Sequence, residues 1–173
     1  MLFRKRYPAI FSDPTLQKHP VFFGFTPGSL EDIAPFFSEE SYSEGAAFSI
    51  STTENNRFII VKSGELEIRE TLKNDWGEEI RTLTPGQWAG AVNLLQSDFS
   101  RIACRTLTPV ELISISEKQA VTLLNTGSRN TNRFFLNLCN VISEILEKLN
   151  RDFIQLYTQE VISGGNLKRR KTD

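Results

Sequence analysis

The stretch FIIVKSGELEIR, residues 58–69, sets the expected fold of this 173-residue chain. Its first part, Phe58–Val61, is rich in aromatic and β-branched residues, which favour strands. After Gly64, Leu66 and Ile68 alternate with charged residues, as in a strand with one face in the core and one in water. Two strands joined by a glycine turn predict a β-rich domain.

The same period of two continues on both sides, from Gly45 to Ile115. The sequence Asn-Asp-Trp-Gly at 74–77 predicts a hairpin turn. Short strands separated by Gly and Pro are typical of a sandwich or jelly roll. The predicted fold class is therefore mainly β with flanking helices, a double-stranded β-helix. Further strands are expected at 79–83, 103–107 and 110–115.

Helical patterns flank the β-rich region. On its N-terminal side, Ser29 is expected to cap a short helix that Pro35 limits, because proline lacks the N–H of an intrahelical hydrogen bond. On its C-terminal side, Ser116 and Gln119 form a capping-box pattern for a helix that Gly127 is expected to end.

A long helical pattern without Gly or Pro runs over residues 129–162, and Gly164–Gly165 is expected to end it. At about 1.5 Å per residue it is on the order of 50 Å long, more than one domain needs for its own core. We expect a homodimer through this helix; the alternative is a wide apolar stripe docked once on its own domain. The predicted seam has coiled-coil spacing and consists of Phe135, Leu138, Ile142, Ile145 and Leu149.

These elements predict four parts: a polar leader at 1–19, a β-sandwich with short helices at 20–128, the dimerisation helix at 129–162 and a basic tail at 163–173. The leader lacks the apolar stretch of a secretory signal, and no run reaches the about 18 apolar residues of a membrane span. We therefore expect a cytoplasmic protein with no membrane partner.

The composition excludes several classes of chemistry. The single histidine, His19, is too little for a histidine-based metal site or a metal-dependent cupin-like enzyme, and we expect it at the surface. Two cysteines, Cys104 and Cys139, cannot build a disulfide framework, an iron–sulfur cluster or a zinc finger. We expect no catalytic residue, no metal, and no cofactor other than a cyclic nucleotide or another small anionic ligand.

The formal net charge of −1 is unevenly distributed. Both ends are basic, with Lys168–Lys171 in the predicted tail, and the body between them is acidic. Duplex DNA is bound largely by neutralising its phosphates, and residues 163–173 are too few for a helix-turn-helix domain. We expect no direct sequence-specific DNA binding, and an unidentified protein partner stays open beside the homodimer.

This order of elements resembles the cyclic-nucleotide-binding domain of the catabolite activator protein family, kinase regulatory subunits and gated channels, without a DNA-binding domain. The resemblance runs roughly from Pro20 to Leu156 and implies a jelly roll with a non-catalytic signalling role. Four motifs carry it, in order: His19–Phe25 before the first helix, Glu44–Gly45 before the first strands, the strand-turn-strand Val61–Ile68, and Leu83–Gly90, similar to the family segment that leads into its phosphate-binding cassette.

In that family the cassette glycine precedes a short helix whose unpaired N–H groups face the cyclic phosphate. The resemblance gives Gly90 this role, and it places Ala91 where the family has a glutamate for the ribose 2′-hydroxyl. The phosphate arginine corresponds to Arg101 when counted from Gly90, and to Ser100 when counted from the following strand. The candidate ligand-binding residues are Gly90, Ala91, Val92, Ser100, Arg101 and Ile102.

Two functions follow from this resemblance. One is a regulatory or sensory module with a degenerate cassette, since losing a charged hydrogen bond weakens binding by about tenfold to a hundredfold. Asn93, where the family has a small apolar residue, is a second departure besides Ala91. The other function is a ligand-free dimeric interaction or scaffold protein that keeps the fold. Titration with cyclic AMP, cyclic GMP and cyclic di-GMP separates the two.

Overall fold

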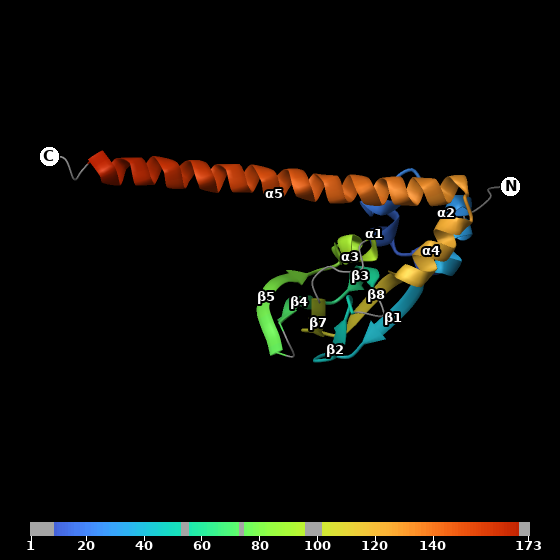
Figure 1. Cartoon of the computed structure of the whole chain (residues 1–173). Helices are drawn as coiled ribbons and strands as arrows, with labels where there is room; N and C mark the ends of the chain where they lie inside the picture. The colour runs from blue at the N-terminus through green and yellow to red at the C-terminus, as the bar shows by residue number, and fades with distance from the viewer. Residues whose placement is uncertain (1–8, 53–55, 73–74, 96–101, 170–173) are drawn as a thin grey trace. The chain divides into compact units, whose positions relative to one another are not determined.

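The computed structural model describes most of the chain, with backbone alone at 70–72, 75–80 and 160–169. Two compact units result from the pattern of contacts, Met1–Leu138 and Cys139–Asp173. In the first unit two antiparallel sheets face each other as a sandwich (Figure 1), which confirms the predicted fold class. The described residues are 9–52, 56–72, 75–95 and 102–169.

Eight short strands in the described residues build the two sheets. The first sheet has the order β1-β8-β3-β6 and the second β2-β7-β4-β5. All paired strands are antiparallel. The strands are β1 Ser38–Tyr42, β2 Ala47–Ser49, β3 Arg57–Ser63, β4 Leu66–Leu72, β5 Asp75–Leu83, β6 Trp88–Ala89, β7 Ile102–Thr106 and β8 Val110–Ser116.

Alternate residues of β3, β4 and β8 contribute to the apolar cluster between the sheets. Ile59 of β3 belongs to one buried apolar cluster with Leu66 and Ile68 of β4. The predicted alternation of β4 is thus confirmed for its apolar side. Its other side is less exposed to solvent than predicted. Glu67 on that side is buried, and the Arg69 guanidinium donates two hydrogen bonds to its carboxylate.

Several of the helices begin with a side-chain cap. Ser116 and Gln119 form the predicted capping box. The first predicted cap is wrong by one turn, because Thr26 is the N-cap of α2 and Ser29 supplies the third helical position of its capping box. The helices are α1 Pro14–Gln17, α2 Pro27–Ile33, α3 Ala91–Leu95, α4 Glu117–Asn125 and α5 Arg129–Arg169, with 3-10 turns at Ala9–Phe11, Pro20–Phe22 and Ala34–Phe36.

Two predicted boundaries are wrong. Strands β4 and β5 form the expected hairpin, but Leu72 pairs with Asp75, so residues 75–77 lie in a strand and not in the turn. The long helix α5 continues past Gly164–Gly165 to Arg169. Glycine lowers helix stability by about 1 kcal/mol but keeps its N–H donor, so it does not stop a helix.

Residues 9–19, predicted as part of a polar leader, pack into the first unit. Phe11 is fully buried and its ring lies edge-on to Phe22, with 4.7 Å between the ring centroids. Phe22 stacks on Phe134 of α5, and Phe37 lies edge-on to the same ring. These four aromatic rings fasten the N-terminal segment to the first turns of α5.

His19 belongs to this packed segment, so its predicted surface position is wrong. It is 3% exposed, and its Nδ1 accepts a hydrogen bond of 3.3 Å from the Val21 N–H. The other ring nitrogen, Nε2, is buried and makes no hydrogen bond. Burial disfavours the imidazolium and lowers the pKa of His19 to about 4.

Candidate functional site

The turn into α3 is the part of the predicted cassette that the structure describes best. Strand β6 ends at Ala89, which pairs with Ile59, and α3 begins at Ala91. Gly90 between them has a φ of +84°. A Cβ at this position would lie 2.0 Å from the Arg57 carbonyl oxygen, so both backbone conformation and contact with β3 require glycine.

The predicted ligand-binding residues are only partly placed. Ala91 is buried at the start of α3, whereas Val92 is 37% exposed. Ile102 is half-buried as the first residue of β7. Ser100 and Arg101 lie outside the described residues, so the predicted phosphate contact stays a prediction.

Asn93, the second departure from the family pattern, anchors α3 in the sandwich. Its side-chain amide donates to Ser51 Oγ at 3.0 Å, and Ser51 donates to Asn56 Oδ1 at 2.9 Å. The Asn56 amide in turn donates to Glu117 Oε2 at 3.2 Å. This chain of hydrogen bonds joins α3, the residues before β3 and the first residue of α4.

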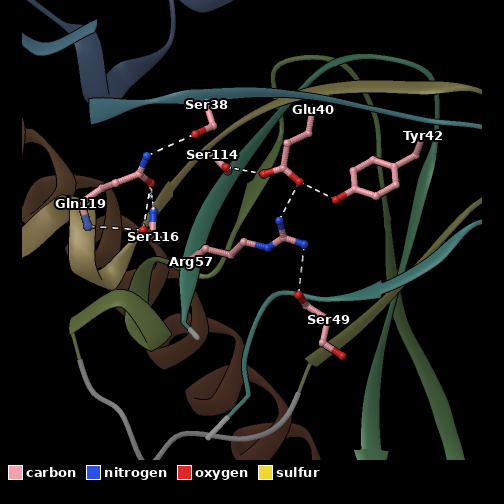
Figure 2. A network of polar contacts seen from close by, with 8 residues as sticks. All are labelled: Ser38, Glu40, Tyr42, Ser49, Arg57, Ser114, Ser116 and Gln119. Carbon is pink, nitrogen blue, oxygen red and sulfur yellow. Dashed lines mark hydrogen bonds and ion pairs between the residues drawn. The ribbon is translucent and has the colours of Figure 1, made fainter. Parts of the chain in front are cut away.

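A second polar cluster, the Arg57 cluster, consists of Glu40, Tyr42, Arg57 and Ser114 (Figure 2). Arg57 Nη1 donates to Glu40 Oε2 at 2.6 Å, and Arg57 Nη2 donates to the Ser49 carbonyl at 3.1 Å. The hydroxyls of Tyr42 and Ser114 donate to the same carboxylate. The cluster therefore holds one guanidinium and one carboxylate against each other at the start of β3.

The Arg57 cluster faces the space between the sheets. Arg57 is two residues before Ile59, and Ser114 is two residues after Leu112; both apolar residues belong to the inner core. The side chains of Arg57 and Glu40 are 12% and 20% exposed. The guanidinium also lies over the Phe48 ring of the other sheet, 5.0 Å from its centroid.

The charges of the Arg57 cluster stabilise each other. Burial by itself raises the pKa of Glu40, but hydrogen bonds from Ser114 and Tyr42 and the Arg57 charge outweigh it, so the net pKa is lowered. Burial likewise disfavours the Arg57 cation, whereas the Glu40 charge raises the pKa of Arg57. Glu40 is therefore a carboxylate and Arg57 a guanidinium at neutral pH.

Sequence reasoning missed the Arg57 cluster. Glu40 and Arg57 are 17 residues apart in the chain, and each directly follows another polar residue, Glu39 and Asn56. The one available signal is register, since Arg57 has the same parity as the inward-facing Ile59. Cys104, also on an inner face, has a pKa raised to about 12 by burial, so it is an inert thiol at neutral pH.

The predicted dimerisation seam on α5 changes character along its length. Leu138 is fully buried within the first unit and is not available to another chain. Phe135 and Ile142 are half-buried. In the second unit Ile145 is 37% and Leu149 60% exposed.

The described residues contain no group of three or more His, Cys, Asp or Glu side chains placed to hold a metal ion. Within the same part of the chain, no helix combines the length and the apolar character that crossing a membrane takes.

The two sheets and the glycine turn into α3 define a jelly-roll fold. A sequence model of the cyclic nucleotide-binding domain matches residues 39–126, just over half of the chain. The chain belongs to the cyclic nucleotide-binding domain family, as the motifs around Val61 and Gly90 suggest. No curated relative matches the sequence.

Solved structures share this fold at low sequence identity. The catabolite activator protein of Thermus thermophilus is 19% identical with a TM-score of 0.65, over 80% of this chain and 63% of that chain. A putative cyclic nucleotide-binding protein of Geobacter metallireducens is 18% identical with a TM-score of 0.59, over 78% of this chain and 98% of that chain. The sensor domain of the transcriptional regulator DNR from Pseudomonas aeruginosa is 15% identical with a TM-score of 0.57, over 79% of this chain and 89% of that chain.

Proposed function

We propose that this chain is a cytoplasmic, non-catalytic regulatory module that works as a homodimer and binds cyclic nucleotide weakly or not at all. Ala91 is the residue on which the proposed weak or absent nucleotide binding rests. It is 1% exposed at the first position of α3, where the family pattern has a glutamate for the ribose hydroxyl. A methyl group there offers no acceptor, and the ligand loses one charge-assisted hydrogen bond.

The homodimer is supported by the exposed apolar face of α5. Five residues, defined here as the α5 seam, step by four, three, four and three, which is the heptad spacing of a coiled coil. The four after Ile142 are 60–68% exposed. The α5 seam consists of Ile142, Leu146, Leu149, Phe153 and Leu156.

A second copy of the chain fits the α5 seam better than another partner. The helix is 41 residues long, and its side chains at 144–159 are exposed throughout. Two identical heptad faces can pair isologously, with each apolar residue packing on its counterpart, and this removes a large apolar stripe from water.

The proposed weak or absent binding of cyclic nucleotide is tested by restoring the missing carboxylate at position 91. We expect Ala91→Glu to bind cyclic AMP at least about tenfold more tightly than the wild-type chain, because one charged hydrogen bond to the ribose is regained. The measurement is calorimetric titration, with cyclic GMP and cyclic di-GMP in parallel. Ala91→Gln is the matched control for size.

The second arm of that experiment addresses the phosphate. Adding Arg101→Ala to Ala91→Glu should remove the gain, since the ligand loses its counter-charge. A folded Ala91→Glu variant without any gain contradicts a cassette at Gly90–Leu95 that is open to nucleotide. The ligand-free dimeric scaffold is then the function that stands.

A further inference from the structure

The Arg57 cluster has donors that the protein does not use. A guanidinium carries five N–H donors. Arg57 gives one to Glu40 and one to the Ser49 carbonyl, while its Nε is buried without any hydrogen-bond partner. A buried donor without an acceptor is costly and therefore uncommon, and it indicates a place where a further acceptor improves the local energy.

The surroundings of Arg57 suit a small oxyanion. Tyr42 and Ser114 both donate hydroxyl protons into the cluster. The Phe48 ring lies under the guanidinium, and the Tyr42 ring stacks on Phe48 with 4.1 Å between the centroids. A guanidinium with two hydroxyl donors is the set of groups that binds a carboxylate or a phosphate oxygen.

The cluster is also within reach of solvent. The hydrogen bond from Arg57 to Ser49 lies at an exposed position, and the Glu40 side chain retains 20% of its accessible surface. Glu40 is in β1, which pairs only with β8 among the described strands. An incoming ion therefore needs to displace one side chain on an edge strand and not to open the whole core.

We propose that Arg57 is an oxyanion-binding residue, and that Glu40 occupies its site as an internal carboxylate. A small ligand with a phosphate or carboxylate group competes with Glu40 for the guanidinium and for the hydroxyls of Tyr42 and Ser114. This site differs from the glycine turn at Gly90, whose contact with Arg57 is through the backbone carbonyl. It needs neither a cyclic nucleotide nor the α5 seam.

Charge supports this competition. Replacing Glu40 by its neutral isostere leaves a buried guanidinium without a counter-charge, which is strongly unfavourable in a protein interior. An anion that binds from solution then supplies the missing counter-charge. In the wild-type chain the Glu40 carboxylate is tethered beside Arg57. An external anion therefore has to compete with a carboxylate whose effective concentration is very high.

The test compares wild-type protein, Glu40→Gln, and the double variant Glu40→Gln with Arg57→Gln. Thermal unfolding and calorimetry are followed against inorganic phosphate and against acetate, at ionic strength matched with sodium chloride. We expect Glu40→Gln to bind phosphate saturably, at least about tenfold more tightly than the wild type. The double variant should lose this binding and keep only the general salt effect seen in the wild type.

The two anions separate the sources of the ligand group, because a phosphate preference points to a phosphorylated ligand and an acetate preference to a carboxylic acid. A folded Glu40→Gln protein with the same anion response as the wild type overturns the proposal and leaves a purely structural ion pair. If Glu40→Gln does not fold, Glu40→Ala serves instead. It also removes the carboxylate and keeps the donors of Arg57, Tyr42 and Ser114, so phosphate affinity should rise in the same way, and an unchanged affinity overturns the proposal.

Discussion

The first turns of α5 and the later turns of the same helix have similar apolar spacing but opposite surroundings. Phe134 and Leu138 are fully buried in the first unit, whereas Leu149 and Phe153 are more than half exposed. Hydrophobic periodicity therefore predicts a helix and its apolar face, but it does not tell what covers that face. The buried part packs on the N-terminal aromatic residues, and a second copy of the chain is the partner that we propose for the exposed part.

The largest expected effect is on the buried part of α5. Phe134→Ala should lower the free energy of unfolding by about 3–5 kcal/mol, because it removes a ring packed on Phe22 and Phe37 and leaves a cavity. Urea unfolding followed by circular dichroism measures it. Leu136→Ala, on an exposed position two residues away, is the control and should change stability by less than about 0.5 kcal/mol. Equal losses of unfolding free energy in the two variants would contradict the difference between the buried and the exposed face of α5.

A pH effect should distinguish the packed N-terminal segment from the exposed helix. The pKa of His19 is lowered to about 4 in the folded protein, so between about pH 6.5 and 4 the unfolded chain binds the extra proton. Stability should therefore fall as the pH falls through this window, by about 3 kcal/mol in total. His19→Gln should flatten the dependence of the free energy of unfolding on pH between about pH 6.5 and 4. If His19→Gln keeps the pH dependence of the wild type, the assignment to His19 is contradicted.

A smaller effect is expected at Asn137, the polar link of the same segment. Its side-chain amide donates to the carbonyls of Val21 and Phe23 at 3.1 and 2.9 Å. Asn137→Ala should lower stability by about 1–3 kcal/mol, since the buried Val21 carbonyl and the part-buried Phe23 carbonyl lose their donor. Asn140→Ala, at an exposed position of α5, is the matched control. Faster hydrogen exchange of the amides of Val21–Phe23 should accompany the loss in Asn137→Ala only.

Much of the fold follows from local patterns in the sequence. The inward-facing Leu66 and Ile68, the turn glycine Gly64 and the capping box at Ser116 each follow from a pattern of a few residues, and the structure confirms each of them. The end of α5 was harder to predict, because two glycines weaken a helix without removing a backbone donor.

The site was less predictable, because it depends on contacts between distant strands. Gly90 was identified from its motif, and the structure explains it by close contact with the Arg57 carbonyl. The pairing of Glu40 with Arg57, the burial of His19 and the link from Asn93 to Ser51 all join residues from different elements. No spacing rule within one element reports such contacts.

The molecular mass in solution is the most direct test of the central claim that α5 makes this regulatory domain a dimer. Light scattering at micromolar concentration should give about twice 19.7 kDa for the wild-type chain. Leu149→Asp, in the middle of the α5 seam, should give a monomer with unchanged β-sheet signal, while Glu147→Gln on the same turn should stay a dimer. A monomeric wild-type chain, or a Leu149→Asp variant that remains a dimer, contradicts the account.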